Sequence, residues 1–217
     1  MYVDTLTLGI LRTNCYLISN DGACVIIDPG AEASRIDAHL KTHGLHPQAI
    51  LLTHGHFDHT GAMWPLYERY QLPIYISSLD LDPLVNPTPR RLLPPPGTQF
   101  ISDGQEIIAA GLRFQVIACP GHTPGSVSYL CEDMLFTGDT LFHQNCGRCD
   151  HAYSSAKDLL ASLDRLRRLP GDYRLFPGHL KSSTLDWERQ NNPFLQPGIQ
   201  LTEPEEDEDE WDSIIKI

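Results

Sequence analysis

Residues Thr53–Thr60 read THGHFDHT and hold three histidines and one aspartate between His54 and His59. Imidazole nitrogens and carboxylate oxygens are good ligands for zinc, iron and manganese. His54 and His56 stand two residues apart, so both side chains can point the same way from an extended segment. Asp58 and His59 are adjacent and can join that pair only through a turn. The spacing therefore predicts two metal positions rather than one.

Two ions need more donors than this stretch supplies, and three further candidates lie at the ends of predicted strands. They are His122 in CPGHTPGS, Asp139 in TGDTLF and His179 in FPGHLK. Seven donors make two incomplete sites that share one carboxylate and leave room for a bridging hydroxide. Incomplete coordination is typical of a catalytic site, whereas a structural site is closed.

The metal-binding stretch belongs to a chain in which strands and helices alternate. Short apolar runs predict buried strands, and apolar residues at helical spacing predict helices. The predicted strands are 24–29, 49–54, 112–119, a hairpin over 126–139, and 173–179; the predicted helices are 31–44, 61–72 and 155–169. In the last helix, five leucines are expected on one side, namely Leu159, Leu160, Leu163, Leu166 and Leu169. This order of elements predicts a layered α/β fold.

Two segments depart from that pattern. Residues 82–97 contain six prolines, which predicts a rigid, non-helical loop. From residue 203 onward the chain carries eight acidic residues and one lysine, a composition typical of disorder. We therefore expect one domain over 1–201 and an acidic tail over 202–217. The tail ends in apolar residues that could contact another protein, although a solvated end is the simpler reading.

Composition excludes several classes of protein. The formal net charge is −12 and no basic patch with interleaved aromatics occurs, so we expect no nucleic-acid partner. No apolar run of 18 residues predicts a membrane span, and the N-terminus lacks the features of a signal peptide. These observations predict a cytoplasmic protein without membrane contact.

The six cysteines are too few for a disulfide scaffold. Cys15, Cys24, Cys119 and Cys131 have apolar neighbours and are expected to be small buried residues. Cys146 and Cys149 form a single CxxC. Such a pair can be redox-active or half of a zinc knuckle, but we favour two thiols in a loop because no second CxxC is present.

The motifs THGHFDH, PGHTPGS, TGDTLF and PGH, in this order, resemble the metallo-β-lactamase superfamily. The likeness spans residues 14 to 197 and implies a four-layer αβ/βα sandwich with two divalent metal ions at one edge. It implies that one metal takes His54, His56 and His122. The other would take Asp58, His59 and His179, with Asp139 bridging, and Asp58 would also orient the nucleophilic water. We expect zinc, with iron and manganese as alternatives.

Within the superfamily, NCYLI, CGR and ERQNNPFLQ are most similar to the short, single-domain branch of glyoxalase II-like hydrolases. That likeness implies hydrolysis of a thioester such as S-lactoylglutathione. A hydroxide bridging the metals would attack the carbonyl, a metal would stabilise the oxyanion, and the thiolate would leave. The expected partner is therefore a small-molecule thioester.

The chain departs from this branch near the expected substrate. Leu180-Lys181 replaces the usual Gly-Pro after the last ligand histidine, and CDHAYSS follows CGR. Glutathione carries carboxylates, so cations are wanted to bind it. Arg148 is the first candidate and Lys181 the second. The pair Arg90 and Arg91 is the third, for which a solvated surface role is the preferred reading.

Three alternatives to the thioester hydrolase remain open at this point. A persulfide dioxygenase-like enzyme would use one iron, held by His54, His122 and Asp139. A phosphodiesterase or nuclease on the same scaffold would need a basic surface that the sequence lacks. A binding protein without turnover would use the acidic tail, but the presence of all seven candidate ligands argues against a decayed site. His39, His43, His46, His143 and His151 are left out of the site.

Overall fold

Two mixed β-sheets dominate the computed structural model of the chain, which describes residues 1–82, 85 and 92–201. The first sheet has the strand order β1-β2-β3-β4-β5-β6, and the second has β14-β13-β10-β9-β8-β7. The first is formed by Tyr2–Leu8, Thr13–Asn20, Ala23–Ile27, His46–Leu51, Ile74–Ile76 and Gln99–Phe100, which are β1 to β6. The second uses β7 Glu106–Ala109, β8 Leu112–Ala118, β9 Val127–Cys131, β10 Met134–Gly138, β13 Arg174–Pro177 and β14 Ser183–Thr184. A small hairpin joins β11 Leu141–Phe142 to β12 Asn145–Cys146.

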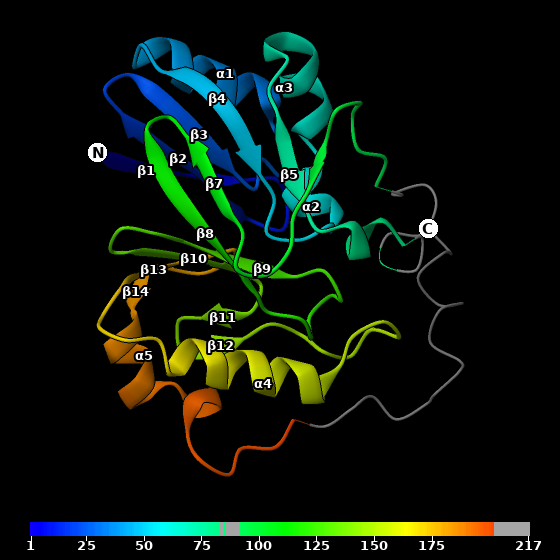
Figure 1. Cartoon of the computed structure of the whole chain (residues 1–217), viewed down its shortest axis with the longest axis vertical. Coiled ribbons are helices and arrows are strands. Elements are labelled where there is room, and N and C mark those ends of the chain that lie inside the picture. The colour runs from blue at the N-terminus through cyan, green and yellow to red at the C-terminus, as the bar shows by residue number, and fades with distance from the viewer. Residues whose placement is uncertain (83–84, 86–91, 202–217) are drawn as a thin grey trace.

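Helices cover the outer face of each sheet (Figure 1). On the first sheet lie α1 Ala33–Thr42 and α3 Met63–Tyr70, with the single turn α2 Phe57–Thr60 before α3. On the second lie α4 Ala156–Arg167 and α5 Leu185–Asn191. Two short 3₁₀ helices, Ser78–Leu81 and Pro193–Leu195, complete the described elements.

Three apolar clusters show how these four layers pack. The inner faces of the two sheets meet in one cluster, where Tyr16 contacts Phe136 and Phe176 edge to face. The other face of the first sheet packs on α1 and α3, through residues such as Ile26 and Leu66. A third cluster joins the outer face of the second sheet to α4 and α5. This arrangement confirms the expected αβ/βα sandwich.

Parallel strand pairs fix where loops that carry polar residues can meet. β3 and β4 run parallel, as do β4 and β5, and β10 and β13. In open α/β sheets, sites form beyond the carboxyl ends of such strands. The segments that follow β4, β10 and β13 carry most of the polar residues singled out in the sequence.

The predicted elements occur, with shifted ends. The strand expected over 24–29 ends at Ile27, because Asp28 adopts a left-handed backbone with φ of 51°. The strand expected over 49–54 spans His46–Leu51. Strands β1, β2, β5 and β7, the two-residue strands β6, β11, β12 and β14, and helix α5 were not predicted from the sequence. β1, β5 and β7 are short or half exposed, so their apolar pattern is weak, whereas β2 is buried over nearly its whole length but has polar residues at both ends of its sequence TNCYLISN.

The leucine face of α4 is narrower than expected. Leu159, Leu163 and Leu166 are buried, together with Ala156 and Ser162. Leu160 lies at the flank of that face and is only half buried, and Leu169 follows the end of the helix at Arg167. The buried stripe therefore combines leucines with two small residues, which let the helix approach the sheet closely.

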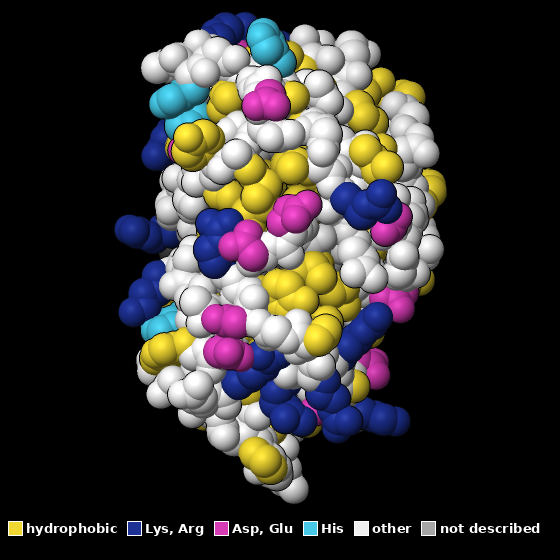
Figure 2. All heavy atoms as spheres, turned by 60° about the vertical axis from the view of Figure 1, so that its left-hand side comes forward, with side chains coloured by type: hydrophobic (Ala, Val, Ile, Leu, Met, Phe, Trp, Pro, Cys, Tyr) yellow, Lys and Arg dark blue, Asp and Glu magenta, His cyan; other side chains and the backbone are white. Residues whose placement is uncertain are grey.

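Basic side chains gather toward the end of the molecule that carries α4 and α5 (Figure 2). Several have acidic partners: Arg167 and Arg168 pair with Asp164, and Arg174 pairs with Asp133. Ion pairs at such exposed positions contribute only about 0–1 kcal/mol each. They account for this cluster of arginines without any ligand.

The acidic tail and part of the proline-rich segment, with Arg90 and Arg91, lie outside the described residues. A protein contact through the tail therefore stays a prediction. Of the helices that the structure describes, none is both long and apolar enough to cross a bilayer.

Candidate metal centre

Five segments converge on one edge of the sandwich and bring together all seven candidate ligands. His54 and His56 follow β4, and the turn of α2 carries Asp58 and His59. The others come from the β8–β9 loop and from the ends of β10 and β13, namely His122, Asp139 and His179. Their ligand atoms form three groups, each with members within 4.8 Å of one another: His54–His56–His122, His54–His59–Asp139 and Asp58–His59–His179.

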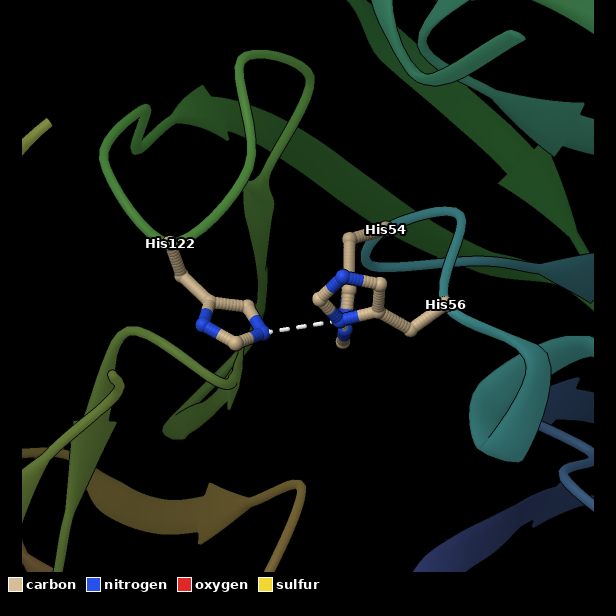
Figure 3. Close-up of side chains that lie close together, drawn as sticks. All are labelled: His54, His56 and His122. Atoms are coloured by element: carbon tan, nitrogen blue, oxygen red, sulfur yellow. Dashed lines mark hydrogen bonds between the residues drawn. The ribbon is translucent and has the colours of Figure 1, made fainter. Parts of the chain in front are cut away.

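The first group consists of three imidazoles that face a common point (Figure 3). His54 Nε2 lies 3.0 Å from His56 Nδ1, which in turn lies 2.9 Å from His122 Nε2. The pKa of His54 lies well below its ordinary value, and that of His56 is lowered to about 3. Burial of the ring is the largest cause in both. These two rings are therefore neutral at pH 7.

The ring nitrogens that point away from the common point, Nδ1 of His54 and of His122, show by their hydrogen bonds which ring atoms carry protons. Thr53 donates its hydroxyl proton to Asp28 at 2.6 Å, so the Thr53 oxygen accepts from Nδ1 of His54. His122 donates Nδ1–H to the main-chain carbonyl of Arg148 at 2.8 Å. A neutral ring that donates from one nitrogen presents a lone pair at the other. His54 Nε2 and His122 Nε2 thus converge with His56 Nδ1 between them, an arrangement that a cation fits.

The second and third groups share His59 and mix carboxylates with imidazoles. His59 donates Nδ1–H to Asp28 at 2.9 Å, which turns its Nε2 towards Asp139 at 3.4 Å and Asp58 at 3.6 Å. His179 Nε2 lies 3.3 Å from Asp58 and 3.4 Å from Asp139. Among the described residues, His59 Nε2 and Asp139 Oδ1 are buried without a hydrogen-bond partner. A buried unsatisfied polar atom costs about 1–3 kcal/mol, and a metal ion would satisfy both.

Ionisation in these groups also fits a cation. Burial raises the pKa of Asp58, but the hydrogen bond from His179 and the charge of His59 lower it to about 2 overall. Burial likewise opposes the ionised Asp139, yet His59 and His179 hold its pKa well below the ordinary value. Conversely, burial lowers the pKa of His179, whereas Asp139 and Asp58 raise it to about 9. Two ionised carboxylates thus attract positive charge that a divalent ion can supply.

Several residues that hold the ligands were missed by the sequence reasoning. Asp28 binds Thr53 and His59, and Thr13 donates to Asp58 at 2.7 Å. Asp80, fully buried, accepts from the amides of Gly55 and Gly125 and thereby links the loops that carry His54 and His122. Asp28 directly follows an apolar strand in IIDPG, a signal that could have identified it, whereas Thr13 at the start of β2 and Asp80 in a 3₁₀ helix carry no such signal.

The predicted substrate residues lie near the centre but do not enter it. The Arg148 side chain is exposed and pairs with Asp150 at 2.6 Å, while its carbonyl orients His122. Lys181 is exposed, two residues beyond His179. His151, left out of the predicted site, stacks on Tyr153 and lies 5.7 Å from His56 between ring centroids.

Cys146 and Cys149 are thiols outside any disulfide, as expected, and both are buried. Cys146 belongs to β12, and Cys149 lies shortly after it. Both are buried in the apolar cluster under α4, where burial raises the pKa of Cys146 to about 12. A thiol of such high pKa is a poor nucleophile at neutral pH. The pair therefore contributes to the apolar packing between the second sheet and α4.

The hydroxyl of Tyr153 orients His56, the remaining imidazole of the first group. This hydroxyl lies 2.7 Å from Nε2 of His56, across 97 residues of sequence. We expect Tyr153→Phe to weaken metal affinity by about 10–100-fold, as loss of an outer partner of a ligand histidine typically does. Competition with a chelator measures this affinity. Tyr173→Phe, at the far end of β13, is the matched control, and equal affinities in both variants would contradict the role of Tyr153.

The chain is similar in sequence and in structure to known proteins. A family model described as Metallo-beta-lactamase superfamily matches residues 8–179. The chain is 32% identical over 201 residues to the Bacillus subtilis protein named "Probable metallo-hydrolase YqgX", covering 88% of this chain and 95% of that one. It is 41% identical over 164 residues to hydroxyacylglutathione hydrolase of Xylella fastidiosa, 75% of this chain and 57% of the relative. A solved structure, TTHA1623 in a di-iron-bound form, has 40% identity and a TM-score of 0.80 over 89% of this chain and all of that one.

Proposed function

Because the chain belongs to the metallo-beta-lactamase superfamily, we propose that it is a metal-dependent hydrolase that cleaves a thioester such as S-lactoylglutathione. The observation that carries the proposal is the convergence of seven donor residues into linked groups around buried, unsatisfied ligand atoms. The likeness to hydroxyacylglutathione hydrolase supports the thioester, although the chain spans only 57% of that relative's length.

The proposed ligands divide between two metal positions. His54, His56 and His122 would hold one ion, and Asp58, His59 and His179 the other. Asp139 would bridge them, since its Oδ2 lies 3.7 Å from His122 of the one set and 3.4 Å from His179 of the other. These nitrogen and oxygen donors suit zinc, which we propose, and also iron or manganese. The di-iron form of a similar structure makes iron the first alternative.

Metal ions bound here would supply a water of lowered pKa and polarise the acyl carbonyl. The protein's own residues would orient the reactants. Asp58, held by the Thr13 hydroxyl at 2.7 Å, is the carboxylate that we propose orients the attacking water. Buried His54 and His59 and the Asp28 carboxylate behind them keep bulk water from the rear of the centre. The departing thiolate needs no strong acid, because thiols ionise far more readily than alcohols or amines.

Arg148 is proposed to bind a carboxylate of glutathione. We expect Arg148→Ala to raise KM for S-lactoylglutathione about tenfold, the equivalent of one charge-assisted hydrogen bond, with little change in kcat. Metal content should stay unchanged, because the contact with His122 uses the main-chain carbonyl. Steady-state kinetics with Arg174→Ala as a surface control measure this. An unchanged KM would remove Arg148 from the substrate site and make Lys181 the next candidate.

One preparation tests the function as a whole. Protein purified without added metal is analysed for metals per chain, and the same sample is assayed for hydrolysis of S-lactoylglutathione. About two metals per chain with hydrolysis supports the proposal. Two metals without hydrolysis of any thioester would reject the substrate class while keeping the metal centre.

A mononuclear iron enzyme of the persulfide dioxygenase type is the second candidate. The observation in its favour is that His54, His122 and Asp139 lie together, with 3.7 Å between the last two. A single iron at this position would leave His59 Nε2 without a partner, and Asp58 and His179 would have no role as ligands. One iron per chain, with oxygen uptake on glutathione persulfide and no thioester hydrolysis, would select it.

A further inference from the structure

The loop after β13 carries the proposed ligand His179 and is bound by a residue of the other sheet. The side-chain amide of Asn14, the second residue of β2, donates to the carbonyl of Pro177 at 3.0 Å and to that of Leu180 at 2.9 Å. The main-chain amide of Asn14 donates to the carbonyl of Gly178 at 2.7 Å. One residue thus makes three hydrogen bonds to the four-residue segment that contains His179.

The side chain of Asn14 is buried and can face only one way. Both protons of its Nδ2 go to carbonyl oxygens, and its Oδ1 accepts from the hydroxyl of Thr7 on β1 at 3.2 Å. An amide turned the other way would place its oxygen against two carbonyl oxygens. The loop around His179 therefore depends on an amide group at this position, and a side chain without donors could not replace it.

The backbone of this loop would relax without such a contact. Leu180 has a φ of 68°, in the left-handed region that favours glycine. For a residue with a side chain, this conformation is disfavoured by about 5–30-fold. The Leu180 side chain is exposed, so its packing offers little compensation. The hydrogen bond from Asn14 to the Leu180 carbonyl opposes the relaxation directly.

His179 depends on its main chain more than the other four ligand histidines do. Each of those has a partner for the ring nitrogen that points away from the metal positions. The partners are Thr53 for His54, Tyr153 for His56, Asp28 for His59 and the Arg148 carbonyl for His122. Nε2 of His179 faces Asp58 and Asp139, but within the described part of the chain no hydrogen bond reaches its Nδ1. Its place therefore follows from the loop that Asn14 holds.

We propose that Asn14 is the positioning residue for His179 and thereby sets the affinity of the second metal position. This position is the one assigned above to Asp58, His59 and His179. The residue before Asn14 acts on the same position, because the Thr13 hydroxyl donates to Asp58 at 2.7 Å. The inference rests on the proposed division of the ligands between two ions, and it does not depend on the substrate.

Competition with a chelator tests the inference on the zinc-loaded protein. Zinc retained per chain, measured at rising chelator concentration, gives an affinity for each of the two ions. Asn14→Ala should weaken one ion by about 10–100-fold, as loss of an outer partner of a ligand histidine typically does, and should leave the other within about twofold. Asn20→Ala is the matched control, because Asn20 ends the same strand and donates to the carbonyl of Ala110 at 3.3 Å. It should keep both affinities.

Leu180→Gly separates positioning of His179 from a general loss of strand stability. Glycine adopts the left-handed conformation without strain, so the loop then needs less support from Asn14. Added to Asn14→Ala, this change should restore the weakened affinity by about fivefold or more. Destabilisation of β2 alone would not be reversed by a substitution in the other sheet.

The outcomes that overturn the inference are distinct from those that reject the proposed function. Equal affinities in Asn14→Ala and Asn20→Ala, no recovery with Leu180→Gly, or a wild-type protein that binds a single ion would each overturn it. If Asn14→Ala does not fold, Thr7→Val at an exposed residue takes its place and should weaken the same ion by about 2–10-fold; an unchanged affinity overturns the inference. Because the ions are counted without a substrate, absence of thioester hydrolysis rejects the proposed function alone.

Discussion

Replacing Asp139 with alanine is expected to remove both metal ions and to lower kcat/KM for a thioester by more than about 100-fold. The reason is its position between the two groups: its carboxylate lies 3.4 Å from His59, 3.4 Å from His179 and 3.7 Å from His122. Loss of a mere outer partner already costs about 10–100-fold, so loss of a shared ligand should cost more. Elemental analysis and kinetics on the same sample measure both effects.

Asp133→Ala is the matched control for this change. Asp133 precedes β10, whereas Asp139 follows it, and its exposed carboxylate pairs with Arg174. Its loss should leave metal content and turnover unchanged, because exposed ion pairs contribute little. Should Asp139→Ala retain two metals and normal turnover, the proposed bridge would be wrong.

Gly178→Ala is expected to displace the second metal and to lower activity by a similar factor without changing any ligand. A Cβ atom at this position would lie 2.1 Å from Oδ1 of Asp139 and 2.7 Å from Cε1 of His59. Both distances are far below van der Waals contact, so Asp139 or His59 must move. Overpacking of this kind also destabilises a fold, typically by about 1–3 kcal/mol. Metal content and thermal unfolding of the purified variant measure the two consequences.

Gly171→Ala separates this steric effect from the backbone cost of alanine. Gly171 has a φ of 85° and open space around it, so alanine there is strained but contacts nothing. It should lose about 1 kcal/mol of stability and keep both metals. If Gly178→Ala bound two metals as tightly as Gly171→Ala, the close packing between β13 and the centre would not control the ligands.

These variants probe different parts of the metal centre and its surroundings. Asp139 tests the charge shared by the two groups, and Gly178 tests the space between them. Tyr153→Phe tests a partner outside the ligands, and Arg148→Ala tests the substrate side. Because the sites are separate, loss of metal can be told apart from loss of substrate contact.

The order of elements was readable from the sequence where the periodicity was strong. The apolar stripe of α4 and the buried strands β3, β8 and β10 have patterns that admit one secondary structure. Strands β1, β2 and β7 did not stand out. Half of β1 and β7 is exposed, so their stability comes from pairing with neighbouring strands rather than from their own composition.

By itself the sequence determined the set of candidate donors. His54, His56, Asp58 and His59 are close in the chain, so backbone geometry alone keeps them together in any fold that contains a strand ending at Leu51. The glycine-flanked His122, Asp139 and His179 were also apparent, because each follows an apolar strand. Their chemistry is a property of residue type and spacing.

Only the tertiary structure decided which atoms face one another and what holds them. Tyr153 reaches His56 across 97 residues, and Asp28 reaches His59 across 31. Asn14 binds the carbonyl of Leu180, directly after the ligand His179, across 166 residues. Such contacts depend on strand order and register, which arise from packing the whole chain. Local composition carries no trace of them, since a tyrosine or leucine in a loop looks the same whether or not a metal ligand lies beside it.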